Sequence, residues 1–210
     1  MNKLILLRHG QSQWNLENRF TGWRDVPLTE KGVQEAIEAG KLMKKNNISI
    51  DLIFSSVLQR ATDTAKLAVL EMNLNQLWNE NNELIMIKDQ ALNERDYGDL
   101  VGLNKQETAN KFGKEQVHTW RRSYDTPPPG GESLKNVVER VKPYFHINIE
   151  PALKKQKNIL IAAHGNSLRA MMICIGLFQP EEISKIELPT GSPFVFYYEE
   201  NELIKSEYLV

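Results

Sequence analysis

The chain has 210 residues and a mass of 24.2 kDa, and its 26 Lys and Arg against 27 Asp and Glu give a formal net charge of −1. Nucleic-acid-binding proteins and polybasic membrane-surface proteins usually carry a basic excess, so this balance argues against both classes. A content of 41% hydrophobic and 25% charged residues is ordinary for a globular protein and excludes disordered and collagen-like classes. The length fits one domain, which we expect to span residues 1–210.

Short apolar runs at 4–7, 52–54, 159–163 and 194–198 predict strands, with a more peripheral one at 84–87. The runs at 4–7 and 159–163 are continuously apolar, as expected of central strands covered on both faces. Between the strands, helical spacing of apolar residues predicts helices from Thr29 to 43, over 57–70, from 132 through 141, and over 167–175. Strands that alternate with helices predict an α/β fold with a mostly parallel sheet and helices on both faces.

The segment from about 93 to 131 differs from its surroundings because polar residues dominate it and no strong strand signal is present. It ends at 125–131 in Asp-Thr-Pro-Pro-Pro-Gly-Gly, where three prolines stiffen the chain and two glycines free it. We interpret this segment as an insertion that covers one end of the sheet.

Cys174 is the single cysteine of the sequence and lies in an apolar run, which favours a packed small hydrophobe over a nucleophile. One cysteine cannot form an internal disulfide, so we expect a reducing compartment. The apolar residues after Met1 are too few for a signal peptide, and no run approaches the ~20 residues of a membrane span. These features predict a cytoplasmic protein without a membrane partner.

The pattern His-Gly-x-Ser occurs twice, at His9 to Ser12 and at His164 to Ser167, each time at the carboxyl end of a predicted buried strand. Ligands bind at that end of the strands in open α/β folds. If the two strands are neighbours, the two imidazoles face each other across one pocket. Neither histidine has a neighbouring carboxylate or cysteine at metal-ligand spacing, and Arg8 beside His9 repels a cation. Arginine binds phosphate in a bidentate manner, so we predict a phosphate site without a metal.

The run Leu-Arg-His-Gly-Gln-Ser-Gln-Trp-Asn at 7–15, with Phe-Thr-Gly-Trp at 20–23, resembles the signature of the histidine phosphatase superfamily. Further blocks continue the resemblance in order to Pro-Thr-Gly at 189–191. The block from Glu94 to Arg122 is similar to that of the cofactor-dependent phosphoglycerate mutases. The resemblance implies interconversion of 3-phosphoglycerate and 2-phosphoglycerate in glycolysis and gluconeogenesis. It also implies a phosphohistidine intermediate primed by 2,3-bisphosphoglycerate, and no metal.

The resemblance implies a role for each matching residue. His9 is the implied nucleophile, His164 stabilises the transferred phosphoryl group, and Arg8 and Arg60 clamp it. Glu94 is the implied general acid and base, with a pKa that we expect to be raised by nearby phosphates. The implied substrate-binding residues are Gly10, Gln11, Ser12, Gln13, Trp14, Asn15, Thr21, Gly22, Arg95, Asp96, Tyr97, Lys105, Arg121, Arg122, Gly165 and Asn166.

One of these residues departs from the family pattern, because Asp96 stands where many members carry an uncharged residue or a histidine. A carboxylate near an anionic ligand weakens binding unless it points away or pairs with a cation such as Arg95. Three alternatives remain open: a histidine-type phosphatase acting on small phosphate esters, a bisphosphoglycerate synthase that uses the same residues, and a binding protein without catalysis. The full set of His9, Glu94, His164 and both arginines argues against the third. Small anionic substrates are the expected partners, and the sequence is compatible with a monomer or a homo-oligomer.

Overall fold

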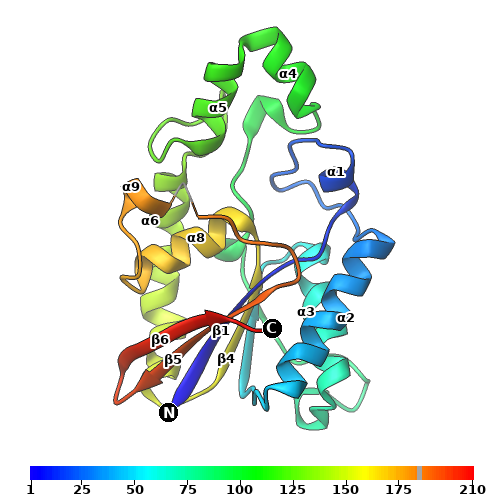
Figure 1. The fold of residues 1–210 in the computed structure, drawn as a ribbon, viewed down its shortest axis with the longest axis vertical. Helices are drawn as coiled ribbons and strands as arrows, with labels where there is room; N and C mark the ends of the chain where they lie inside the picture. Colours follow the sequence, from blue (N-terminus) through cyan, green and yellow to red (C-terminus); the bar gives the residue numbers. More distant parts are fainter. Residues whose placement is uncertain (184–185) are drawn as a thin grey trace.

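The computed structural model describes residues 1–183 and 186–210. Its centre is a six-stranded sheet with the strand order β3-β2-β4-β1-β5-β6 (Figure 1). The pairs β3–β2, β2–β4 and β4–β1 are parallel, whereas β1–β5 and β5–β6 are antiparallel. The predicted mostly parallel sheet is confirmed, with an antiparallel hairpin added at one edge. The strands are β1 (Asn2–Arg8), β2 (Leu52–Ser55), β3 (Ile87–Lys88), β4 (Ile159–Ala163), β5 (Pro193–Glu199) and β6 (Glu202–Tyr208).

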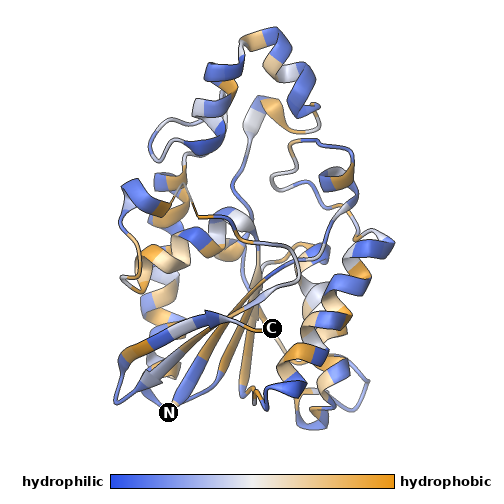
Figure 2. Cartoon of the chain, in the orientation of Figure 1, coloured by the Kyte–Doolittle hydropathy of each residue, from blue (hydrophilic) through white to orange (hydrophobic). Residues whose placement is uncertain are grey.

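Helices cover both faces of the sheet, as the continuous apolar strands predicted. Alternate residues of β1 enter opposite cores, so that Leu4 and Leu6 pack with the cluster containing Val137, while Ile5 and Leu7 pack with the cluster containing Ala39. The central strands are accordingly apolar along their length (Figure 2). The larger helices are α2 (Glu30–Lys45) and α3 (Gln59–Met72) on one face and α6 (Leu134–Tyr144) and α8 (Gly165–Cys174) on the other.

Local sequence signals set where these helices begin. The Thr29 hydroxyl accepts a hydrogen bond from the Gly32 N–H and caps α2, and the Ser133 hydroxyl does the same for α6 with Asn136. The predicted helices are confirmed, although α8 begins at Gly165 and not at residue 167. The shorter helices are α1 (Gln13–Leu16), η1 (Asn75–Leu77), η2 (Gln90–Leu92), η3 (Gly98–Leu100), α4 (Lys105–Phe112), α5 (Lys114–Arg122), the π-helical turn η4 (Phe145–Ile149), α7 (Glu150–Lys154) and α9 (Pro180–Ile183).

Residues 93–131, which we call the cover, carry the two helices α4 and α5. In Figure 1 these helices lie at the end of the molecule opposite the N-terminus. Phe20, Leu100 and Val117 form a small apolar cluster there, separate from the two cores beside the sheet. The proline-rich end of the cover is held to its beginning, because the Asp99 N–H donates to the Pro129 carbonyl at 2.9 Å.

The single cysteine packs as predicted. Cys174 is partly buried at the end of α8 and contacts the core on that face of the sheet. Burial raises the pKa of its thiol to about 11, so the thiol stays protonated at neutral pH. Its chemistry is that of a small hydrophobe.

Candidate active site

Two histidines meet at the carboxyl ends of the central strands. Strands β1 and β4 pair with Arg8 opposite Ala163, and the His9 N–H donates to the Ala163 carbonyl at 3.0 Å. The ring of His164, directly after β4, has its centroid 5.0 Å from that of His9, with 59° between the ring planes. Both histidines are buried. The prediction that the two imidazoles face each other is therefore confirmed.

The hydrogen bond of the His9 ring fixes which nitrogen is free. The Nδ1 atom lies 2.7 Å from the Gly10 carbonyl oxygen, which can only accept, so Nδ1 carries the proton and donates. Burial lowers the pKa of His9 well below 6.5, and the charges of Arg60 and Arg8 lower it further. The ring is therefore neutral at pH 7, and its Nε2 atom presents an unprotonated lone pair suited to nucleophilic attack.

The ring of His164 is held by a hydroxyl. Its Nε2 atom lies 2.7 Å from the Ser56 Oγ atom, and the Leu58 N–H donates to the same oxygen. The Nδ1 atom has no hydrogen-bond partner among the described residues. Burial lowers the pKa of His164 most, and the charge of Arg60 lowers it further, so that this pKa lies well below 6.5. His164 is thus a neutral ring with one polar atom left to serve a ligand.

Arg8 and Arg60 are anchored so that part of each guanidinium remains available. Arg60 is almost fully buried and donates to the carbonyls of Arg24 and Gly22 at 2.9 and 2.8 Å, while Arg8 donates to the Leu188 carbonyl at 2.6 Å. Burial lowers the pKa of Arg60 to about 10, which leaves it charged at neutral pH. The Nε atoms of both arginines have no partner among the described residues. Arg8 and Arg60 are therefore cations with buried, unpaired N–H donors, which suit an anionic phosphate.

Glu94 faces the same space as the two histidines, held by donors from two segments. Its Oε1 atom accepts from the Arg95 N–H at 2.7 Å, and from the N–H and Nδ2 of Asn166 at 3.1 and 3.0 Å. Burial raises the pKa of Glu94, but these hydrogen bonds and the charges of Arg60 and Arg8 outweigh it and lower the pKa overall. The pKa of Glu94 in the protein alone therefore lies below its ordinary value, and a rise beside bound phosphates stays a prediction.

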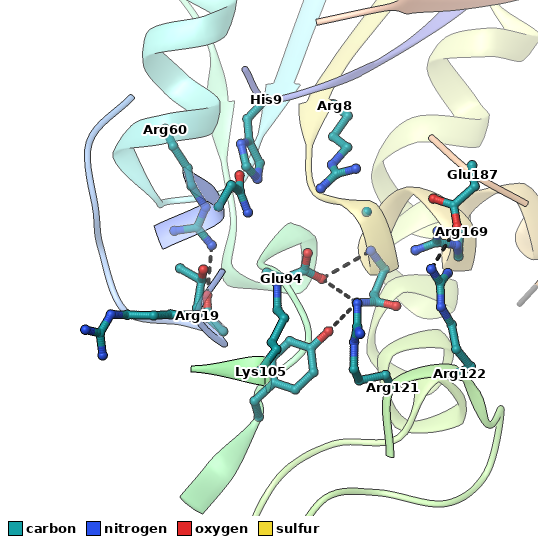
Figure 3. Close-up of a pocket in the computed structure, with 16 residues that line it drawn as sticks. Arg8, His9, Arg19, Arg60, Glu94, Lys105, Arg121, Arg122, Arg169 and Glu187 are labelled. Atoms are coloured by element: carbon teal, nitrogen blue, oxygen red, sulfur yellow. Dashed lines mark hydrogen bonds and ion pairs between the residues drawn. The ribbon is translucent and has the colours of Figure 1, made fainter. Parts of the chain in front are cut away.

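His9, Glu94 and the two arginines line a cavity of about 170 Å³ (Figure 3). The predicted catalytic residue His164 is fully buried beside the His9 ring and is not among the lining residues. Seven cationic side chains and two carboxylates lie among the described residues that line it, so its wall is strongly positive. Thirteen of the predicted site residues line the cavity, namely Arg8, His9, Asn15, Thr21, Gly22, Arg60, Glu94, Tyr97, Lys105, Arg121, Arg122, Gly165 and Asn166. The cover supplies Lys105, Arg121 and Arg122 to the end of the cavity beyond Glu94.

Five predicted residues directly after His9 do not line the cavity. The loop turns away from it because the Ser12 hydroxyl caps the short helix α1, which then carries Gln13 and Trp14. Gly10 packs its backbone against that of Gly32 at the start of α2, and the Gln11 carbonyl accepts from the Thr29 N–H. Gly10, Gln11, Ser12, Gln13 and Trp14 thus shape the loop that presents His9 without lining the cavity, and their contact with substrate stays a prediction.

Arg95 and Asp96 also lie outside the cavity wall. Arg95 is fully buried, stacks its guanidinium over the Tyr97 ring at 4.7 Å, and donates to the Tyr97 hydroxyl and the Arg121 carbonyl. The carboxylate of Asp96 accepts from the Gly98 N–H at 2.9 Å, so it closes a backbone turn. Asp96 therefore binds backbone and does not line the cavity, and Arg95 acts through the two cavity residues that it holds.

Three residues line the cavity that sequence reasoning missed: Arg19, Arg169 and Glu187. Arg169 lies four residues after Gly165 on α8, and this helical spacing is a signal that could have identified it. Arg19 extends from the segment after α1 and donates to the Gly102 carbonyl at 2.7 Å. Glu187 belongs to no motif, so its place in the wall depends on the tertiary structure alone.

Within residues 1–183 and 186–210, no helix is long and apolar enough to cross a membrane. No group of three or more His, Cys, Asp and Glu side chains there is arranged to hold a metal ion.

Comparison with known proteins places this geometry in a family. The model of the histidine phosphatase superfamily (branch 1) matches residues 4–208. A 2,3-bisphosphoglycerate-dependent phosphoglycerate mutase of Rhodopseudomonas palustris (strain BisB18) is 51% identical over 204 residues, covering 97% of this chain and 95% of that protein. One of Protochlamydia amoebophila (strain UWE25) is 48% identical over 227 aligned residues, covering 99% of this chain and 100% of that protein.

Solved structures show the same fold. A mycobacterial glucosyl-3-phosphoglycerate phosphatase aligns with a TM-score of 0.77 at 25% identity, covering 100% of this chain and 98% of that one. Bacillus stearothermophilus YhfR aligns with the same TM-score and identity, over 97% of this chain and 95% of that one. The sequence matches are closer and extend over nearly the whole chain. This chain therefore belongs to branch 1 of the histidine phosphatase superfamily and, within it, to the 2,3-bisphosphoglycerate-dependent phosphoglycerate mutases.

Proposed function

We propose that this chain interconverts 3-phosphoglycerate and 2-phosphoglycerate through a phosphohistidine on His9, primed by 2,3-bisphosphoglycerate. The observation that carries the proposal is a neutral His9 with a free Nε2 in the same arginine-lined cavity as the Glu94 carboxylate. A bisphosphoglycerate carries on the order of −4 to −5, from two phosphates and a carboxylate. Seven cations against two carboxylates match that charge closely.

The residues present fit a ligand with two phosphates. The unpaired Nε atoms of Arg8 and Arg60 and the unpaired Nδ1 of His164 surround His9, where the transferred phosphoryl group would lie. Lys105 and Arg121 line the far end of the cavity, where a second anionic group would bind. Phosphoryl transfer depends mainly on positioning and charge stabilisation, which arginines and neutral imidazole donors supply.

The chemistry divides into two transfers that share one base. In the first, the Glu94 carboxylate takes the proton of the substrate hydroxyl, whose oxygen attacks the phosphorus as the bond to His9 Nε2 breaks. In the second, the Nε2 lone pair attacks the other phosphate, and the departing ester oxygen recovers the proton from Glu94. The lowered pKa of Glu94 in the free protein leaves it ionised and ready to act as the base. Bound phosphates then raise that pKa, so that Glu94 can hold the proton between the transfers.

Hydrolysis of the phosphohistidine by water would make the same site a phosphatase. The cationic far end of the cavity, with Lys105, Arg121 and Arg122, supports the mutase activity. A mutase must bind its substrate at both ends, and these side chains would bind the anionic group that lies away from His9. Bisphosphoglycerate synthesis would use the same residues. We further propose that no metal takes part, since a wall with a large cationic excess repels a cation, and that the enzyme works in the cytoplasm as glycolysis requires.

One experiment tests the proposal. The protein is incubated with 2,3-bisphosphoglycerate labelled in its phosphates, and mutase turnover is measured with and without the bisphosphate while released phosphate is followed in parallel. We expect label that is labile in acid and stable in base on the natural protein and on His118→Ala, which removes an exposed histidine of α5. His9→Asn should carry none. Label on His9→Asn at the level of the natural protein would refute the nucleophile. Phosphate release that exceeds turnover would establish a phosphatase.

A further inference from the structure

One carboxylate stands at the far end of the cavity among cations. The Glu187 side chain contacts Arg122 of the cover helix α5, with Oε1 and Nη2 2.8 Å apart. Figure 3 shows the Glu187 carboxylate beside Arg169, on the side of the cavity where Arg122 enters. Both partners remain reachable by solvent, with side-chain exposures of 70% for Glu187 and 34% for Arg122. An exposed pair of this kind contributes little to stability, so its presence in a ligand cavity calls for another explanation.

The backbone on either side of Glu187 is tied to the cavity by arginines. Arg169 donates from Nε and Nη2 to the Ile186 carbonyl at 3.0 and 2.8 Å, and Arg8 donates to the Leu188 carbonyl at 2.6 Å. The Tyr208 hydroxyl donates to the Glu187 carbonyl at 3.3 Å. These bonds hold the backbone on both sides of Glu187, which keeps the Glu187 carboxylate within reach of the cavity.

The Glu187 carboxylate is ionised and acts on several cations at once. Partial burial raises its pKa, but Arg122, Arg169 and Arg8 together lower it below the ordinary value. Because the charge lies in the cavity wall, it offsets part of the positive field that would bind a second anionic group. The Glu187 carboxylate, which already accepts a hydrogen bond from Arg122, must also be displaced or share Arg122 when the second anionic group of the ligand binds.

We propose that Glu187 is an affinity-setting residue, an internal counter-ion that occupies Arg122 and weakens the binding of the bisphosphate. The inference rests on the proposed mutase function. A mutase must bind its bisphosphate intermediate tightly enough that the intermediate is not released before the second transfer. It must also bind the intermediate weakly enough for it to reorient within the site. Binding that is equally tight throughout the cycle does not raise turnover, so a carboxylate that competes for Arg122 keeps the intermediate mobile.

Three variants test the role. Glu187→Gln removes the charge and keeps the size, Glu187→Asp keeps the charge, and Glu181→Gln removes a charge from the nearby exposed helix α9 without contact to a cavity arginine. Each is assayed for kcat and for the 2,3-bisphosphoglycerate concentration that gives half-maximal turnover. The dissociation constant for 2,3-bisphosphoglycerate is measured in the His9→Asn background, where His9 cannot react. Thermal unfolding confirms that each variant is folded.

We expect Glu187→Gln to bind 2,3-bisphosphoglycerate about tenfold more tightly, the size of one partly screened charge interaction, and to turn over more slowly. Glu181→Gln should resemble the natural protein, and Glu187→Asp, which keeps the negative charge in the cavity wall, should tighten binding less than Glu187→Gln does. A purely structural role would instead weaken binding when the ion pair is lost. Unchanged or weaker binding in Glu187→Gln, unchanged kcat, or equal tightening in Glu181→Gln would overturn the inference. Absence of mutase turnover in the natural protein would refute the proposed function itself, which separates the two failures.

Discussion

The contact between Gly10 and Gly32 offers a sharp test of how the nucleophile is held. A Cβ atom added to Gly10 would lie 2.2 Å from the Gly32 carbonyl oxygen. That neighbour is backbone at the start of α2 and cannot rotate away. The Gly10 carbonyl also accepts the Nδ1 proton of His9, so any shift of Gly10 moves the partner that fixes the imidazole. We therefore expect Gly10→Ala to disturb both packing and chemistry.

The size of both effects follows from the distances. Ordinary contacts of a Cβ atom begin at 3.4 Å, so the loop and α2 must separate by about 1 Å. Forcing an extra methyl group into a packed interior costs about 1–3 kcal/mol of stability. A displacement of about 1 Å at a reacting group lowers the rate by on the order of a hundredfold. Gly10→Ala should therefore lose about 1–3 kcal/mol and about two orders of magnitude in turnover.

A matched variant separates the two losses. A Cβ atom at Gly40 would lie 2.2 Å from the Ala68 carbonyl oxygen, an equally close backbone contact between α2 and α3. Gly40→Ala should lose similar stability but keep most of its turnover, because Gly40 holds no catalytic group. Urea unfolding and turnover at saturating substrate are measured on both. If Gly10→Ala retains as much turnover as Gly40→Ala at equal loss of stability, the reasoning about His9 is wrong.

Three further outcomes are expected. Glu94→Gln should fold normally and lower mutase turnover by on the order of a hundredfold, the usual range for a lost general acid and base, and near-normal turnover would place proton transfer elsewhere. His9 and His164 are neutral in the folded protein with pKa values well below 6.5, so the unfolded chain takes up protons first as the pH falls. The free energy of unfolding, measured in urea, should therefore decrease progressively from about pH 6.5 downward. A free energy of unfolding that rises on acidification would contradict this. Replacing the prolines at 127–129 with glycine should loosen the cover and raise phosphate release relative to turnover, and an unchanged ratio in the folded protein would show that this segment is not the water barrier.

The sequence predicted the elements whose side chains are apolar on both faces. Strands β1 and β4 were identified because burial on both faces leaves a continuous apolar run. Strand β6 was missed because it is a mostly exposed edge strand whose polar residues, such as Lys205 and Glu207, hide the strand signal. The cover helices α4 and α5 were also missed, since they bury only Thr108 and Val117 and so show a weak helical pattern.

The site was predicted best where a side chain must reach the ligand itself. His9, Glu94 and the cover cations lie in the cavity as the resemblance implied. The resemblance also implied substrate contacts for Gly10 to Trp14, but the cap at Ser12 turns the chain immediately after the nucleophile and these residues do not line the cavity, so their contact with substrate stays a prediction. Glu187 could not have been found from the sequence, because tertiary contacts bring it to the cavity: Arg8 and Arg169 donate to the carbonyls of its neighbours, and Arg122 pairs with its carboxylate.

The place of β1 in the sheet sets the order in which the protein can form during synthesis. Strand β1 leaves the ribosome before either of the strands that it pairs with, β4 on one side and β5 on the other, with Leu4 opposite Ile159 and Phe196. At 5–20 residues per second, roughly 8–30 s of translation separate β1 from its first partner. During that time the apolar residues of β1 have no neighbouring strand to pair with, so the nascent chain exposes an aggregation-prone segment of the kind that chaperones bind. Because His9 follows β1 directly, the nucleophile reaches its position only after β4 has been made.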